Sequence, residues 1–223
     1  MKFYAIKKGK RPGIYTSWDE AKEQVSGFSG AVYKSFKTLA EAEAFIDKKD
    51  NQENEAQKLA EDYFAVIFTD GGTRNTGNIR GGHVKETDKA AWAYLIEETR
   101  TDKRYDGAGG VYGATNNQME LTAFINALAA LIELNLNQKK LLFCLDSKYV
   151  LDNIPRIGDW KKRGWRTTNG PVKNQEYWQR LENLLALFPD PHYLWVKGHD
   201  KSAGNIYVDH KLNKVMDKMA KKE

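Results

Sequence analysis

Four acidic residues stand where a strand is expected to end or a helix to begin. Asp70 and Asp146 each directly follow a run of apolar residues, and Glu120 and Asp209 fall near the expected starts of two helices. Each acid alone has an ordinary explanation, because Asp-Gly is a common turn pair. Asp146 could cap the helix after it, and acids near a helix start complement the helix dipole.

The four acids as a group predict a site for divalent cations. The strand ends of an open α/β sheet border its ligand crevice, so acids there can converge. Converging carboxylates repel one another, and a bound cation offsets that repulsion. Their oxygen ligands favour Mg²⁺, with Mn²⁺ as a substitute, over zinc, and the chain has one cysteine and four histidines. Two such ions about 3.5–4 Å apart suit in-line displacement at phosphorus.

His199 lies in a loop between the last expected strand and the last expected helix. A histidine in a loop often has no chemical role. Beside a cluster of carboxylates and metal ions, however, an imidazole that titrates near neutral pH could help proton transfer at a leaving group. Both explanations are open from the residues alone.

The elements that must position these residues predict an α/β fold, a mixed sheet flanked by helices. Strands and hairpins come first, and helices then alternate with strands. A continuous apolar strand is typical of the centre of a sheet that is covered on both faces. The expected strands are residues 63–69, 91–97, 104–111, 140–145 and 193–196, and the expected helices are residues 119–134, 147–153, 177–188 and 205–221.

A charged segment over residues 48–62 predicts a solvated linker between two domains. Residues 1–47 alternate short β-prone runs with amphipathic runs, which indicates a small α+β domain. Residues 63–223 would form the larger, catalytic domain. The N-terminal domain is small enough to be only marginally stable by itself.

The composition indicates a soluble, cytoplasmic protein with no membrane partner. The 223 residues are 41% hydrophobic and 12% aromatic, which excludes wholesale disorder. We find neither an apolar run of about 20 residues nor an N-terminal signal-peptide pattern. The single cysteine excludes an internal disulfide, and the net charge of +5 is a weak indication of polyanionic partners.

The segments around the acids resemble those of the type-1 ribonucleases H, in the same order and with similar spacing. The matching residues are 69–72, 115–121, 145–150, 160–165 and 195–199, followed by Asn205 and Asp209. The N-terminal domain is similar to the hybrid-binding domain that precedes some of these enzymes. That match lies in residues 3–5, 13–15 and 33–36 and in Trp18.

The resemblance implies a ribonuclease H-like mixed five-stranded sheet and a hydrolase activity. The enzyme would be an endonuclease that cuts the RNA strand of an RNA–DNA hybrid by two-metal-ion catalysis, leaving 5′-phosphate and 3′-hydroxyl ends. Two Mg²⁺ ions would be the cofactor. The resemblance makes Asp70, Glu120, Asp146 and Asp209 the metal ligands, and His199 the helper in proton transfer or product release.

The resemblance also implies how the hybrid is held. Asn116 and Asn117 would read the minor groove, where 2′-hydroxyls are displayed, unless Asn116 only caps its helix. A segment with three cations between two indoles would grip the DNA phosphates, unless its tryptophans are core residues. The expected phosphate contacts are Trp160, Lys161, Lys162, Arg163, Thr115 and Asn174, and the expected contacts of the N-terminal domain are Tyr4, Trp18, Tyr33 and Lys34.

The chain departs from the family pattern in two notable places. Residues 74–89 form a longer and more polar insertion than the usual hairpin turn, either a loop at the substrate edge or an idle insertion. Gly113 stands where a phosphate-contacting arginine is often found, and smaller departures are Gln118 and Arg156. None of these departures changes the acids.

Two other functions are conceivable for a chain with these residues. A catalytically inactive hybrid-binding protein would have no use for four converging carboxylates, which destabilise a fold unless they are compensated. Another nuclease or a strand transferase on the same fold is the second rival, since a fold does not determine a substrate. The Asn116–Asn117 pair and the basic segment favour the hybrid. We expect a monomer.

Overall fold

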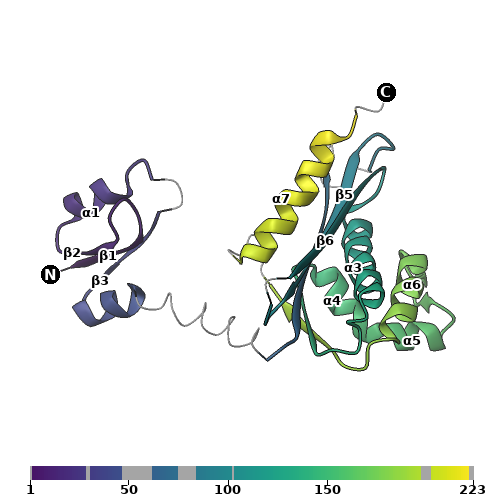
Figure 1. Cartoon of the computed structure of the whole chain (residues 1–223). Coiled ribbons are helices and arrows are strands. Elements are labelled where there is room, and N and C mark those ends of the chain that lie inside the picture. Colours follow the sequence, from purple (N-terminus) through teal and green to yellow (C-terminus); the bar gives the residue numbers. More distant parts are fainter. Residues whose placement is uncertain are drawn as a thin grey trace. The chain divides into compact units, whose positions relative to one another are not determined.

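The computed structural model describes residues 2–28, 31–46, 62–74, 84–101, 103–196 and 202–220 (Figure 1). The chain divides into two compact units, Met1–Leu59 and Ala60–Glu223. Apart from Asp62, the expected linker over residues 48–62 lies outside the described residues, so the domain boundaries stay a prediction. None of the described helices is both long and apolar enough to cross a membrane.

The N-terminal unit has a three-stranded antiparallel sheet in the order β2-β1-β3. Its elements are β1 (Phe3–Lys8), β2 (Gly13–Tyr15), α1 (Trp18–Val25), β3 (Val32–Phe36) and a helix over residues 39–46. Thr38 begins that last helix, because its hydroxyl accepts from the Glu41 amide while the Glu41 carboxylate accepts from the Thr38 amide. The buried apolar residues are few: Ala5, Ile6, Ala21 and Ala42.

The second unit contains the predicted mixed five-stranded sheet, in the order β10-β7-β4-β5-β6. The first three strands of that order are parallel, and β4, β5 and β6 form an antiparallel meander. The expectation of a mixed sheet flanked by helices is confirmed. The strands are β4 (Ala65–Arg74), β5 (Lys89–Glu98), β6 (Arg104–Tyr112), β7 (Leu141–Leu145) and β10 (Pro191–Trp195).

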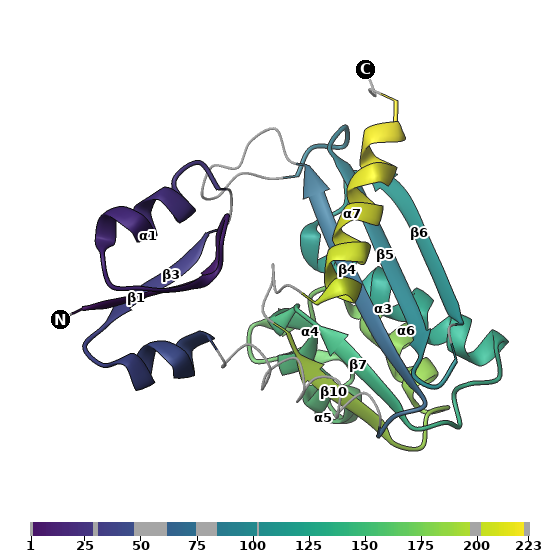
Figure 2. The same cartoon turned by 60° about the vertical axis from the view of Figure 1, so that its left-hand side comes forward.

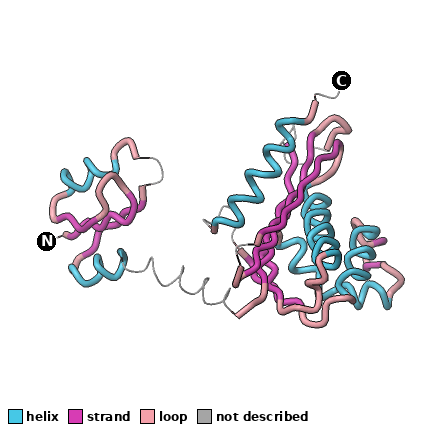
Figure 3. The backbone as a smooth tube through the Cα atoms, viewed as in Figure 1, coloured by secondary structure: helices cyan, strands magenta, loops and turns pink. Residues whose placement is uncertain are grey.

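Helices cover both faces of this sheet (Figures 1, 2 and 3). The C-terminal helix α7 (Ala203–Lys218) packs on one face with Val208, Leu212 and Met216. A group of helices, of which α3 is the longest, covers the other face and packs around Phe124 and Trp178. That group is α3 (Asn116–Glu133), α4 (Lys148–Asn153), α5 (Ile157–Lys162) and α6 (Gln175–Leu185), joined by a 3₁₀ turn (Ile154–Arg156) and the short strands β8 (Arg166–Thr167) and β9 (Gly170–Pro171).

Three local expectations were wrong. Asp70 does not end its strand at a turn, because β4 continues through it to Arg74, paired residue by residue with β5. Helix α3 begins at Asn116 rather than at residue 119, so Glu120 lies beyond its first turn. Helix α5 was not expected at all, since six residues with one buried apolar position give little periodic signal.

Gly71 allows α3 to pack directly on β4. A Cβ atom at this position would lie 2.2 Å from both the Glu120 amide nitrogen and the Met119 carbonyl carbon, a distance that real contacts do not reach. Only a residue without a side chain fits between the strand and the helix. The acid before this glycine on β4 and the acid on the adjoining turn of α3 are therefore brought together.

Candidate active site

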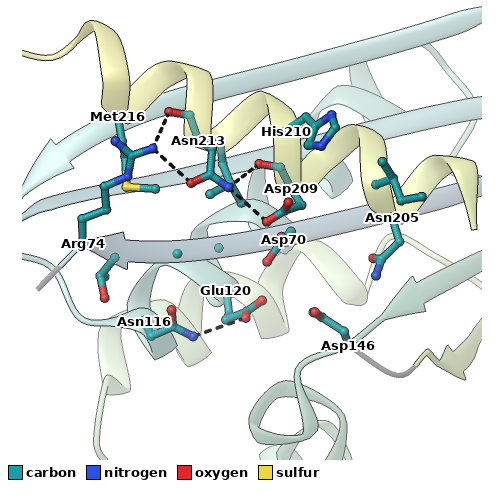
Figure 4. Close-up of a pocket in the computed structure, with 15 residues that line it drawn as sticks. Asp70, Arg74, Asn116, Glu120, Asp146, Asn205, Asp209, His210, Asn213 and Met216 are labelled. Atoms are coloured by element: carbon teal, nitrogen blue, oxygen red, sulfur yellow. Dashed lines mark hydrogen bonds between the residues drawn. The ribbon is translucent and has the colours of Figure 1, made fainter. Parts of the chain in front are cut away.

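Three carboxylates from different elements meet at one place on the larger unit (Figure 4). Asp70 comes from β4, Glu120 from α3, and Asp146 from the segment that follows β7. One oxygen atom from each carboxylate lies within 4.8 Å of the others. They line a pocket of about 600 Å³, and Asp209 reaches the same pocket from α7. The structure thus brings all four predicted acids to one cavity.

Strand register explains why two of these acids are neighbours. Strands β4 and β7 are parallel and adjacent, and Thr69 is paired with Leu145. The residue after each member of this pair is an acid, Asp70 within β4 and Asp146 just beyond β7, so the two acids lie side by side. The strand segments that precede both acids are fully buried, so the two carboxylates follow well-packed parts of the sheet.

Burial and mutual repulsion perturb the acids strongly. The pKa of Asp70 is raised to about 7, first by burial and then by the charges of Asp146 and Asp209, against a smaller opposing effect of the Gly71 amide. Burial, followed by the charges of Asp146 and Asp70, raises the pKa of Glu120 well above its usual range. Ionisation of this group is therefore unfavourable in the cation-free chain.

The donor atoms of the pocket fit a divalent cation. Carboxylate oxygens are the ligands that Mg²⁺ and Mn²⁺ prefer, and a bound cation would favour the ionised acids. Asn205 supports the same conclusion, because it lines the pocket while its buried Oδ1 accepts no hydrogen bond from any residue that the structure describes. A carbonyl oxygen of this kind can accept from ordered water at the site.

Asp209 is tied to two residues that the sequence analysis did not assign to the site. Asn213 donates through Nδ2 to Asp209 Oδ1 at 3.1 Å and to the Asp209 carbonyl oxygen at 2.9 Å. Arg74 donates to Asn213 Oδ1 at 3.2 Å. The spacing of four residues between Asp209 and Asn213, which places them on one helix face, is the signal that could have found Asn213.

Asn116 and Asn117 lie in the first turn of α3, and both are exposed. The alternative that Asn116 caps this helix is wrong, because Thr115 is the cap and forms a capping box with Gln118. The Asn116 amide donates to the Glu120 carboxylate at 3.5 Å and lines the pocket. One of the two predicted groove readers therefore contacts a predicted metal ligand.

Two expectations lie outside the described residues. His199 belongs to the segment 197–201, and most of the insertion falls in residues 75–83, so its role stays open. The described part of the insertion is its two flanks. At these flanks Arg74 contacts Asp217 and Asn213, and Lys89 donates to the carbonyl oxygens of Met216 and Met219.

The basic segment is divided between core packing and solvent. Trp160 packs edge-on against the buried Trp178, with 5.5 Å between ring centroids. Lys161 forms an ion pair with Glu182 at 2.6 Å. Lys162 and Arg163 are exposed. Trp160 thus packs the end of α5 against the core, and the side chains of Lys162 and Arg163 extend from that end into solvent.

The predicted phosphate contacts Thr115 and Asn174 both stand at helix starts, before α3 and α6. Asn174 adopts a left-handed conformation (φ 57°) and donates to the Tyr149 hydroxyl at 3.0 Å. Gly113 also has a positive φ, of 73°, and a Cβ there would lie 3.1 Å from the Glu86 Cα. An arginine would be strained in this conformation.

Aromatic residues of the N-terminal unit form an exposed surface. Trp18 lies between Tyr4 and Tyr33, with ring centroids 5.4 Å and 5.7 Å away. Trp18 and Tyr33 remain 39% and 47% exposed, so they are not core residues of this small unit. Lys34 follows on the same strand and is exposed too. The residues expected to contact nucleic acid in this unit are accessible.

Comparison with known families accounts for both units. Residues 2–46 match the family described as the ribonuclease H1 N-terminal domain, and residues 62–222 match the family described as RNase H. A ribonuclease H of Polaromonas naphthalenivorans is 39% identical over 72% of this chain and 91% of its own length. One from Paracidovorax citrulli is 40% identical over 69% of this chain and 94% of its own.

Solved structures share the fold at lower identity. LC9-RNase H1, described as a type 1 RNase H with the type 2 active-site motif, is 24% identical with a TM-score of 0.59, over 71% of this chain and 74% of its own. The solution structure of the PFV RNase H domain is 18% identical with a TM-score of 0.54, over 69% of this chain and 94% of its own. These two comparisons concern the fold alone.

The raised pKa of Asp70 predicts how pH affects the stability of the metal-free protein. Between about pH 4 and pH 7 the folded chain retains a proton that the unfolded chain releases, so the free energy of unfolding falls as pH rises. Asp70→Asn removes this effect. In excess chelator at pH 7.5, we expect the variant to be more stable by about 1–4 kcal/mol, a gain that disappears near pH 4.

Urea unfolding at several pH values measures this difference. Asp152→Asn, which changes an exposed carboxyl on α4, is the control and should leave the pH dependence as it is in the wild type. Parallel curves for wild type and Asp70→Asn would show that Asp70 is not destabilised by its surroundings.

Proposed function

The chain belongs to the ribonuclease H family, whose members cleave the RNA strand of RNA–DNA hybrids, and from that premise we propose how this chain does so. Its carboxylate pocket holds two divalent cations, Mg²⁺ with Mn²⁺ as a substitute, and hydrolysis leaves 5′-phosphate and 3′-hydroxyl ends. The observation that carries the proposal is the meeting of Asp70, Glu120 and Asp146 within 4.8 Å.

Each acid has a separate part in this proposal. Asp70 and Asp146 hold the cations from the rigid sheet, Glu120 from α3, and Asp209 from the opposite wall of the pocket. The bound cations would supply activation of the attacking water and compensation of charge on the leaving oxygen. His199 would give or take the proton at the leaving group.

The minor-groove reading is assigned to the start of α3. The side-chain amides of Asn116 and Asn117 both donate and accept hydrogen bonds, so they can pair with base edges and with 2′-hydroxyls. Asn116 also contacts Glu120. A groove reader beside a metal ligand favours a hybrid whose RNA strand lies over the carboxylates, because only RNA presents the 2′-hydroxyl.

The DNA strand is held by cations and helix starts. Lys162 and Arg163 are exposed at the end of α5 and form no ion pair with any residue that the structure describes, so they can meet phosphates directly. Lys161 would exchange its partner Glu182 for a phosphate, and Trp160 keeps the segment in place. Thr115 and Asn174 complete the phosphate contacts at two helix starts.

The N-terminal unit is proposed as a second grip on the same hybrid. The aromatic surface of Tyr4, Trp18 and Tyr33 can pack against sugars, and Lys34 can meet a phosphate. The two relatives named above align over more than nine tenths of their own length but over about 70% of this chain. The unaligned parts of those relatives are too short for a unit of this size, so we propose the N-terminal unit as an addition to the catalytic domain.

The rival functions are less well supported by the pocket. A protein that only binds hybrids would hold buried acids of raised pKa at a cost in stability with no compensating task. A strand transferase on this fold does not need the exposed Asn pair at the minor groove. A cytoplasmic location and a monomeric state remain predictions from the sequence.

The first prediction for this function concerns strand specificity. The wild type should cut the RNA strand of a strand-labelled hybrid in Mg²⁺, and excess chelator should abolish cutting. Asp146→Asn should abolish cleavage while hybrid binding survives, because the amide removes the charge that holds a cation. Asp152→Asn on α4 is the matched control and should cut normally. Equal cutting of duplex DNA, or full activity in chelator, would contradict the proposal.

The second prediction concerns the N-terminal unit. Deletion of residues 1–50 should leave cleavage of short hybrids nearly intact and should reduce the number of cuts per encounter on a long hybrid. A tethered second grip raises the local substrate concentration, to about the mM range for short linkers. Trp18→Ala combined with Lys34→Ala should reproduce the defect. Deletion should also flatten the salt dependence of binding by about one log–log unit for each lost phosphate contact.

The measurement is single-encounter cleavage with excess unlabelled trap, on a long hybrid and on one too short for both units. An equal number of cuts per encounter from the truncated and full-length proteins on the long hybrid would show that the unit has another partner.

A further inference from the structure

Asp209 differs from the other acids in what supports it. Asp70, Glu120 and Asp146 form a mutual cluster on the strands and on the helix beneath them, whereas Asp209 enters the pocket from α7 on the opposite face of the sheet (Figure 4). Its usefulness as a ligand depends on the direction of its carboxylate. A surface helix alone does not fix that direction, because an aspartate side chain can rotate.

Asn213 fixes the carboxylate from one helical turn away. Its Nδ2 donates both to Asp209 Oδ1, at 3.1 Å, and to the Asp209 carbonyl oxygen, at 2.9 Å. Many helical asparagines make the second bond, as Asn126 does to Thr122 at 2.8 Å. Unlike Asn126, Asn213 also donates to a carboxylate oxygen, Asp209 Oδ1. This bond leaves the second carboxylate oxygen of Asp209 available to the pocket.

Arg74 determines which way the Asn213 amide faces. The two ends of an asparagine amide have nearly the same shape but opposite hydrogen-bonding character. Arginine can only donate, and Arg74 donates to Asn213 Oδ1 at 3.2 Å. The carbonyl end must therefore face Arg74, so the NH₂ end faces Asp209.

Arg74 is itself held in place. The same guanidinium donates to the Asn213 carbonyl oxygen at 3.2 Å and pairs with Asp217 at 2.5 Å. Arg74 is the last residue of β4, the strand that carries Asp70. A continuous chain of polar contacts thus leads from the end of β4 across to the carboxylate on α7, as the dashed lines of Figure 4 show in part.

We propose that Arg74 and Asn213 are positioning residues that orient Asp209 for cation binding and thereby for cleavage. The inference rests on the proposed function, since it assigns Asp209 to the cations. Neither residue touches the substrate or a reacting atom in this scheme. Arg74 acts through Asn213, so a substitution of either residue should disturb the same property, the orientation of the Asp209 carboxylate.

Calorimetric titration of the metal-free full-length protein with Mn²⁺ tests the proposal without relying on activity. Asn213→Ala should weaken Mn²⁺ binding about tenfold, at the lower end of the range for residues that orient metal ligands. Asn213→Leu should do the same, because it keeps the branched shape of the side chain and loses all three of its hydrogen bonds. Arg74→Met should give a smaller loss. Asn126→Ala, which removes only a bond to a helix carbonyl, should bind as the wild type does.

The double variant Arg74→Met, Asn213→Ala separates a relay from two independent effects. If Arg74 acts through Asn213, the double variant should bind Mn²⁺ no more weakly than Asn213→Ala does. Cleavage should follow the same order, with a higher Mg²⁺ concentration for half-maximal rate and an unchanged KM for the hybrid. Urea unfolding of each variant checks that a change in cation binding does not reflect loss of the fold.

Three results would overturn the inference. Unchanged Mn²⁺ binding in both Asn213 variants, beside a wild type that binds, would refute it and leave the proposed function intact. An additive loss in the double variant would refute the relay through Asn213. No Mn²⁺ binding by the wild type would refute the proposed function and this inference together.

Discussion

The structure of the larger unit is arranged around the mutual repulsion of buried carboxylates. Asp70, Glu120 and Asp146 approach one another within 4.8 Å, and their own charges, after burial, raise the pKa values of the first two. Acids left to themselves would separate or keep their protons. The fold prevents the first outcome, since Asp70 and Asp146 follow paired residues of adjacent parallel strands. Gly71 keeps Glu120 close to Asp70, because the missing side chain lets α3 pack directly against β4.

A site that is strained without a cation is well prepared to bind one. Geometry is fixed before the cation arrives, so little conformational entropy is lost on binding. The opposite wall of the pocket follows a different principle. Asp209 lies outside the three-acid cluster, although its charge also raises the pKa of Asp70, and it reaches the pocket from α7. The contacts of Arg74 and Lys89 attach that helix to the ends of β4 and β5.

The sequence could predict those features that depend on short-range patterns. The acids, the apolar strands and the mixed sheet were predicted because each leaves a local signature, and the exposed aromatics of the first unit came from the family resemblance. The spacing of Asn213 four residues after Asp209 is a local signal, but the orientation of its amide depends on Arg74, which is remote in sequence and could not be predicted. Helix α5 was missed because its stability comes from packing of Trp160 and Ile157 rather than from periodicity. The start of α3 was placed too late because Thr115 and Gln118 form a capping box ahead of the apolar positions.

We expect a bound cation to relieve the repulsion in this pocket by displacing protons from the acids whose pKa is raised. Mn²⁺ binding to the metal-free protein, measured by calorimetry at pH 7 in buffers of different ionisation enthalpy, tests it directly. The observed enthalpy should depend on the buffer, with release of on the order of one proton per protein. The release should decline toward pH 9, where more of the Asp70 population is already ionised. Binding with the same enthalpy in every buffer at pH 7, and hence with no proton released, would contradict it.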